Sequence, residues 1–122
     1  MNHLLEPNYN FVHHKHESRF EELITMYDFN NNKEYDVAFY ILSLPVFDME
    51  KIKSYIKSDG RILFDDMINE GYWSSGEIGL MKLAHTLFSG VYDYSIMDIF
   101  SSLDHINKLA AMEAMRIRFI FV

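Results

Sequence analysis

The 122-residue sequence contains no cysteine, only two prolines and only five glycines. Without cysteine, the chain can form neither a disulfide nor a thiolate metal site. The scarcity of proline and glycine favours helices joined by short loops over a turn-rich β architecture. The longest unbroken apolar run, residues 37–42, is far shorter than the roughly 18 residues that span a membrane. The first ten residues show no secretory pattern, so we expect a cytoplasmic protein without a membrane contact.

The composition is that of one acidic globular domain. Apolar residues make up 49% of the chain, which is enough to build a core and argues against global disorder. Eighteen acidic and eleven basic residues give a net charge of −7, which disfavours direct nucleic-acid binding because phosphate is repelled. Residues 1–66 hold twelve acids and seven bases, a net of −5. A partner with a basic surface would therefore contact the N-terminal half.

Apolar residues recur at helical spacing along most of the chain. The pattern predicts a mainly α fold, a compact bundle of about five helices. Residues 1–14 are expected to form an irregular N-terminal arm, and residues 15–122 a single helical domain. The expected helices cover residues 16–27, 33–43, 49–57, a segment that begins after Ser74, and residues 103–118.

Polar residues and one glycine mark several of these helix ends. Asp48 and Ser95 are suited to be N-caps, because their side chains can accept hydrogen bonds from first-turn N–H groups. Ser74 and Glu77 match the spacing of a capping box. Gly90 suits the left-handed position that follows a helix.

The C-terminal segment has two readings. Residues 116–121 either continue the last helix or form a strand that pairs with residues 61–64. The second reading would add a short two-stranded β element to the bundle. The inward face of the last helix is expected to consist of Ile106, Leu109, Ala110, Met112, Ala114 and Ile117.

Three clustered histidines, His13, His14 and His16, are the candidate metal ligands. Neutral imidazoles bind zinc or nickel. Chelation by a helix, however, needs residues at i and i+4, and this cluster lacks that spacing. The alternative is a polar entry into the first helix.

No complete catalytic motif is present. Asp65 and Asp66 follow an apolar segment and could hold magnesium, but the phosphate-binding glycine-rich motif that usually accompanies such acids is missing. The alternative for this pair is two solvated carboxylates. His85, on an apolar helix face, is expected to be a hydrogen-bonded, partly buried histidine. The sequence implies no cofactor.

Aromatic residues supply the candidate interaction sites. Tyr72 and Trp73 lie in a loop bounded by glycines, where they can either bind a partner or close the edge of the core. Phe119 and Phe121 lie in the apolar tail. If residues 119–122 paired with a second copy, the protein would be a homo-oligomer.

Four segments, residues 15–23, 38–42, 98–104 and 113–119, together resemble a family of small proteins of unknown function found in Firmicutes, their phages and mobile elements. The resemblance implies a bacterial or phage cytoplasmic setting and a compact helical domain. It implies no catalytic residues. The leading hypothesis from the sequence is a non-enzymatic protein-interaction module, and the alternative is a small metal-binding protein or a metal-assisted hydrolase.

Overall fold

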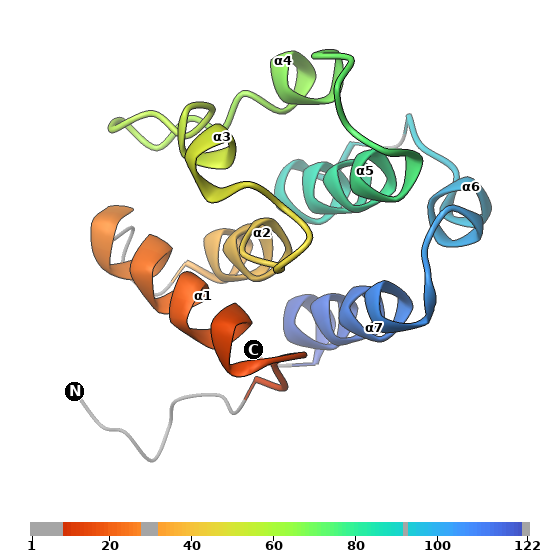
Figure 1. Cartoon of the computed structure of the whole chain (residues 1–122), viewed down its shortest axis with the longest axis horizontal. Helices are drawn as coiled ribbons and strands as arrows, with labels where there is room; N and C mark the ends of the chain where they lie inside the picture. Colours follow the sequence, from red (N-terminus) through yellow and green to blue (C-terminus); the bar gives the residue numbers. More distant parts are fainter. Residues whose placement is uncertain (1–8, 28–31, 92, 121–122) are drawn as a thin grey trace.

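The computed structural model describes residues 9–27, 32–91 and 93–120. These residues form seven α-helices and no β-strand (Figure 1). The mainly α fold is confirmed, whereas the expected number of about five helices is too low. The helices are α1 (His14–Tyr27), α2 (Lys33–Leu42), α3 (Met49–Lys53), α4 (Phe64–Ile68), α5 (Ser75–Ser89), α6 (Ile96–Ser101) and α7 (His105–Phe119).

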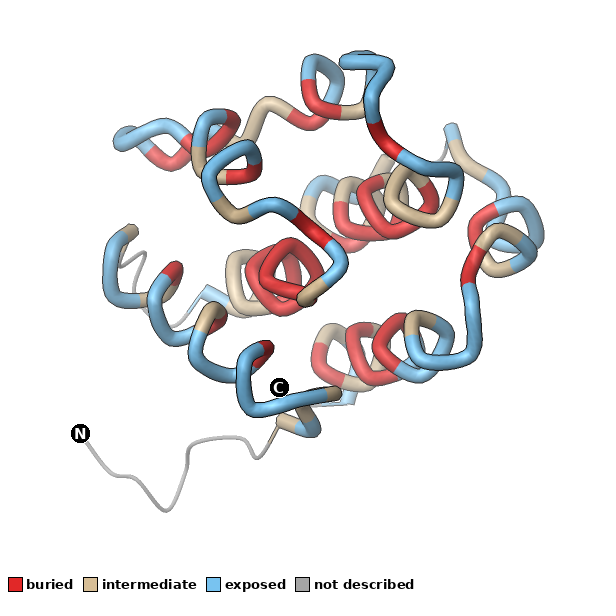
Figure 2. Tube along the Cα trace, in the orientation of Figure 1, coloured by how far each residue is buried: buried red, intermediate tan, exposed pale blue. Residues whose placement is uncertain are grey.

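Helix α2 is the centre of the molecule. Its residues 37–42 are all fully buried, and helices α1, α5 and α7 pack around it (Figures 1 and 2). A helix that is apolar on all sides must be covered on all sides, which explains why the longest apolar run became the core helix. Helices α4 and α6 pack on α5.

The four predicted helix caps are confirmed. The Asp48 side chain accepts the N–H groups of two first-turn residues of α3. Ser74 and Glu77 form the full capping box of α5, and Gly90 ends that helix with a φ of 72°, which a glycine adopts without strain. Ser95 caps α6. These ends depend on local side-chain chemistry, so a single sequence suffices to find them.

The short two-stranded β element is not present in the described part of the chain. Ile62 forms only an isolated antiparallel bridge with Ile56, and Phe64 already begins α4. Helix α7 continues to Phe119, and the N–H of Ile120 still donates to the Arg116 carbonyl at 2.8 Å. The backbone groups of this segment are thus used within the helix and are not available to a strand partner.

Helix α7 buries three alanines and one isoleucine and leaves several larger apolar side chains exposed. Its buried apolar side chains are Ala110, Ala111, Ala114 and Ile117. The expected inward positions of Ile106, Leu109 and Met112 are wrong: these side chains are 53%, 54% and 56% exposed. The buried face is centred on Ala110, Ala114 and Ile117. Leu109 and Met112 lie on a flank of the helix away from that face, and Ile106 lies in the first turn of the helix.

The described part of the N-terminal arm, residues 9–13, is irregular and precedes α1. Residues 1–8 lie outside the described residues, so the predicted boundary between arm and domain stays a prediction. No helix in the described segments has the length and apolar character to cross a membrane.

Candidate interaction surface

The three candidate metal ligands do not share one face. His13 and His14 are exposed, with ring centroids 4.1 Å apart, but His16 is fully buried. The Nε2 atom of His16 lies 2.7 Å from the Tyr40 carbonyl oxygen, and its Nδ1 atom accepts the N–H of Val12 at 3.2 Å. Both ring nitrogens of His16 therefore have backbone partners, which fixes the neutral tautomer with the proton on Nε2.

Burial lowers the pKa of His16 to about 4, and the nearby Arg19 charge acts in the same direction, while the hydrogen bond to Tyr40 opposes the change. The imidazole is accordingly neutral at physiological pH. It acts as a core residue that joins the arm, α1 and α2. Within the described ranges, no group of three or more His, Asp and Glu side chains is placed to hold a metal ion. Asp65 and Asp66 are exposed in the first turn of α4.

The loop aromatic residues divide between core and surface. Trp73 is only 9% exposed, and its Nε1 donates to the Met67 carbonyl at 2.7 Å. Tyr72 is 47% exposed, with its hydroxyl 2.9 Å from that of Tyr55. The ammonium of Lys51 lies 4.2 Å from the centre of the Tyr72 ring. Trp73 thus closes the core edge, and of the pair only Tyr72 presents a ring to solvent.

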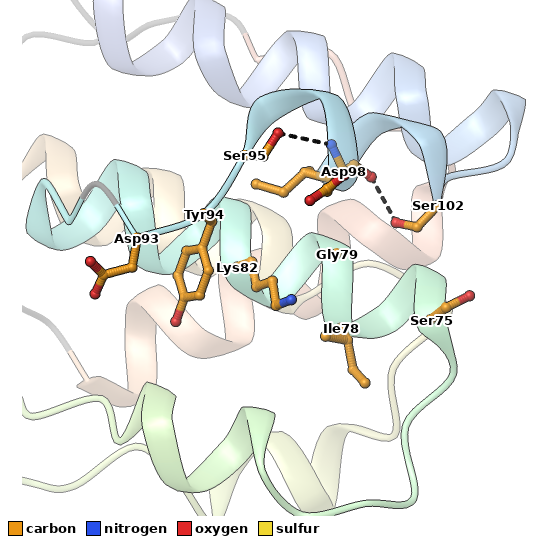
Figure 3. Close-up of a pocket in the computed structure, with 10 residues that line it drawn as sticks. Ser75, Ile78, Gly79, Lys82, Asp93, Tyr94, Ser95, Asp98 and Ser102 are labelled. Atoms are coloured by element: carbon orange, nitrogen blue, oxygen red, sulfur yellow. Dashed lines mark hydrogen bonds between the residues drawn. The ribbon is translucent and has the colours of Figure 1, made fainter.

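A pocket of about 280 Å³ with mixed polar and apolar lining lies between α5 and α6 (Figure 3). Two of its serines are used locally: Ser95 accepts the Asp98 N–H at 3.3 Å, and Ser102 donates to the Ile99 carbonyl at 2.7 Å. Lys82 lies 5.5 Å from the centre of the Tyr94 ring. The residues that line the pocket are Ser75, Ile78, Gly79, Lys82, Asp93, Tyr94, Ser95, Asp98, Ile99 and Ser102.

Next to this pocket, His85 is hydrogen-bonded and partly buried, as predicted. Its Nδ1 is 3.0 Å from the Tyr94 hydroxyl, and its ring stacks on Phe64 at a centroid distance of 4.8 Å. Burial lowers the pKa of His85, while the charges of Asp65 and Asp93 raise it. The polar groups around the pocket therefore serve helix ends and packing, and they do not converge on one point.

A larger groove, of about 500 Å³, lies between the N-terminal arm and α7. We call it the arm groove. Its walls are mostly apolar side chains, with one ion pair beside them. It is lined by Asn10, Phe11, Val12, Tyr40, Leu109, Met112, Glu113 and Arg116.

Glu113 fastens the arm to α7. Its carboxylate accepts the Asn10 backbone N–H at 2.9 Å and the Asn10 side-chain amide at 3.3 Å. Arg116 donates to both carboxylate oxygens at 2.7 Å. The Tyr40 hydroxyl also holds the arm, because it donates to the Asn10 carbonyl at 2.5 Å. Burial would raise the pKa of Glu113, but the bonds from Arg116 and Asn10 outweigh it and lower the pKa.

A row of large apolar side chains continues from the groove along α7. We call these five residues the α7 stripe; each is more than half exposed, and Phe119 and Ile120 reach 64% and 67%. Because successive helical residues are about 100° apart, the five positions fall within an arc of about 140° on one side of the helix. The partly exposed Arg116 lies in the same arc, between Met112 and Phe119 along the chain. Phe121 lies outside the described residues. The α7 stripe consists of Ile106, Leu109, Met112, Phe119 and Ile120.

Of the residues predicted for interaction that the structure describes, Tyr72, Trp73 and Phe119, only Phe119 belongs to this surface. The sequence reading did not find Asn10, Tyr40 and Glu113, because their contacts join segments 30 to 103 residues apart. Arg116 pairs with Glu113 three residues away, but only the folded chain shows that this pair holds the arm. One signal was available: α7 carries apolar residues on more than one side, which is more than a single core contact needs.

The comparisons with known proteins place the chain in a family. The comparison with curated proteins and the comparison with solved structures each found no match. A family model matches residues 6–120, a range that contains all seven described helices. The chain therefore belongs to the family of unknown function DUF6075.

Proposed function

We propose that this chain is a non-enzymatic protein-interaction module that binds a partner protein through the arm groove and the α7 stripe. The observation that carries the proposal is the row of five large apolar side chains, each more than half exposed, on one side of a single helix. Single exposed apolar residues are normal on a protein surface, but contiguous ones mark interaction sites.

The energetics favour burial of this surface. Covering one large aliphatic or aromatic side chain contributes about 1.5–3 kcal/mol. The α7 stripe offers five such side chains, and Leu109 and Met112 also line the groove. A partner that covers the groove and the stripe together would gain enough apolar contact to offset the entropy of association.

The pocket between α5 and α6 supports a binding role less well. There, the Ser95 and Ser102 hydroxyls already form hydrogen bonds at the two ends of α6, and the Tyr94 hydroxyl lies 3.0 Å from the His85 Nδ1. The apolar side chains of the α7 stripe have no comparable internal partner. The exposed apolar side chains of α7 therefore support a binding role better than the polar groups of the described residues support a catalytic one.

Site-specific crosslinking tests the proposal. A photo-crosslinking amino acid is placed at Leu109 in the chain, which is expressed in the organism that encodes it. Met26 on α1 is the matched control, because its exposed fraction of 53% equals that of Leu109 to within one percentage point. We expect a discrete adduct from position 109 that is absent from position 26.

A second variant ties the adduct to the surface. Met112→Glu places a charge in the groove without touching the core, and we expect it to abolish the adduct from position 109. Loss of the helical circular-dichroism spectrum would instead indicate unfolding. Equal adducts from both crosslinker positions, or none from position 109, would overturn the proposed function.

A further inference from the structure

The arm groove differs in charge from the rest of the chain. We propose that the segment that occupies it is an acidic amphipathic helix of another protein; this inference rests on the proposed function. The two segments that form the groove's walls, residues 9–16 and α7, carry no exposed carboxylate of their own. The carboxylates of α2 that reach these segments are both engaged, Asp36 by the Tyr9 hydroxyl and Glu34 by Arg118. The acidic residues behind the net charge of −7 therefore lie mainly outside these two segments.

The distribution of acids is the first observation. Residues 9–16 contain no Asp or Glu, and α7 contains only Glu113, which is buried and paired with Arg116. Glu17 directly follows the first segment, and Asp104 directly precedes α7. The Asp104 carboxylate already accepts the Asn107 N–H at 2.8 Å as the cap of α7.

The distribution of basic residues is the second observation. Lys15 and Lys108 are exposed, and neither forms an ion pair within the described residues. Lys108 lies one helical turn from Met112, so its ammonium borders the groove. Lys15 follows the arm directly. Each of the two wall segments therefore carries one exposed lysine, and cationic side chains beside an apolar groove complement a ligand that has apolar residues on one face and carboxylates beside them.

The shape of the surface fits a helix. From Ile106 to Ile120 the α7 stripe covers fourteen residue steps, about 21 Å along the axis, which matches a partner helix of about four turns. Phe11 and Val12 of the arm face Leu109 and Met112 across the groove. An amphipathic helix docks into such a groove with anchors at three- and four-residue spacing.

Selection from a random library tests the inference without knowledge of the natural partner. Displayed 16-residue peptides are selected on the wild-type chain and counter-selected on the Leu109→Glu/Met112→Glu variant. We expect enriched peptides with apolar residues at three- and four-residue spacing and an excess of Asp and Glu over Lys and Arg. An enriched set that is neutral or basic would overturn the inference, although the proposed function would still stand on its crosslinking result.

Charge-reversal variants then locate the effect. The most enriched peptide is synthesised, and its dissociation constant is measured for Lys15→Glu, Lys108→Glu and Lys57→Glu. Lys57 is the matched control, because it is exposed, lies in the loop after α3 and does not line the groove. We expect binding about three- to tenfold weaker for the first two variants and a change below about twofold for the control.

Three results would contradict the inference. One is an equal loss of affinity in all three variants, which would mean that only the total charge matters. Another is enrichment that does not depend on Leu109 and Met112. The third is a dimer in light scattering that Leu109→Glu dissociates, because a second copy would then occupy the groove.

Discussion

The backbone N–H of Asn10 donates to the Glu113 carboxylate at 2.9 Å across 103 residues of sequence. This contact holds the N-terminal arm against α7 and so creates one wall of the arm groove. Arg116 keeps the carboxylate ionised by donating to both of its oxygens. The shape of the proposed binding surface thus depends on one buried acid.

Removal of this charge should loosen the arm. We expect Glu113→Gln to lower the free energy of unfolding at pH 7 by about 1–2 kcal/mol, because the amide cannot accept both Arg116 and Asn10. The value lies below that of a fully buried ion pair because Arg116 is partly solvated. Urea denaturation measures it. Glu21→Gln, an exposed position on α1, is the control and should change stability by less than about 0.5 kcal/mol.

The same pair predicts a pH dependence. The pKa of Glu113 is lowered in the folded state, so its stabilising contribution is present above the unfolded value of about 4.5 and is lost as the pH falls through the folded pKa. The stability difference between wild type and Glu113→Gln should therefore shrink below pH 4.5. A difference that stays constant down to pH 3 would contradict the assignment.

The pKa of His16 predicts a second pH range, above that of Glu113, in which the free energy of unfolding depends on pH. Its folded pKa of about 4 lies below the usual 6.5, so between these values the unfolded chain binds a proton that the folded chain does not. Stability should consequently fall by about 3 kcal/mol as the pH drops from 6.5 to 4. His16→Leu loses its hydrogen bonds and is less stable at pH 7, but its profile should be flatter in this window. Parallel profiles would show that another group carries the dependence.

Substitutions on the two sides of α7 should change the free energy of unfolding by different amounts. Met112→Gln changes an exposed residue and should alter the free energy of unfolding by less than about 0.5 kcal/mol. Ala114→Leu inserts three carbons into the contact with α2 and should cost about 1–3 kcal/mol. Thermal or urea denaturation distinguishes the two. A larger cost for Met112→Gln than for Ala114→Leu would reverse the orientation of the helix.

Gly79 marks the close approach of α5 and α6. A Cβ there would lie 2.3 Å from the Ser102 Oγ and 3.2 Å from the Ile99 carbonyl oxygen. Gly79→Ala should cost about 1–2 kcal/mol, because the steric conflict exceeds the gain in helix propensity. Adding Ser102→Ala removes the nearest atom and should restore part of the loss. If the single variant were as stable as wild type, the two helices would not be in close contact.

Much of the fold could be predicted because its causes are local. The caps at Asp48, Ser74, Ser95 and Gly90 follow from side-chain chemistry within three or four residues. Helix α4 could not be found in this way: it has five residues, and its N-cap, Leu63, makes no side-chain hydrogen bond.

The candidate surface was harder to predict, for two physical reasons. Periodicity treats Ala114 and Met112 alike as apolar, although the two positions are separated by a rotation of about 200° around the helix and only Ala114 is buried. The basic partner surface predicted from the net charge of the whole chain stays a prediction, because binding depends on the few charges at the contact. Only the folded arrangement brings residues 9–16 beside α7 and shows that no exposed carboxylate lies between their ends.

The most direct test of the central claim is amide hydrogen exchange of the purified chain, alone and with the protein captured by the crosslinker at Leu109. We predict that binding slows exchange mainly in residues 9–16 and 105–119, the two walls of the arm groove, and leaves α3 and α4 unchanged. Protection centred on α3, α4 or the α5–α6 pocket, with none in α7, would contradict the account.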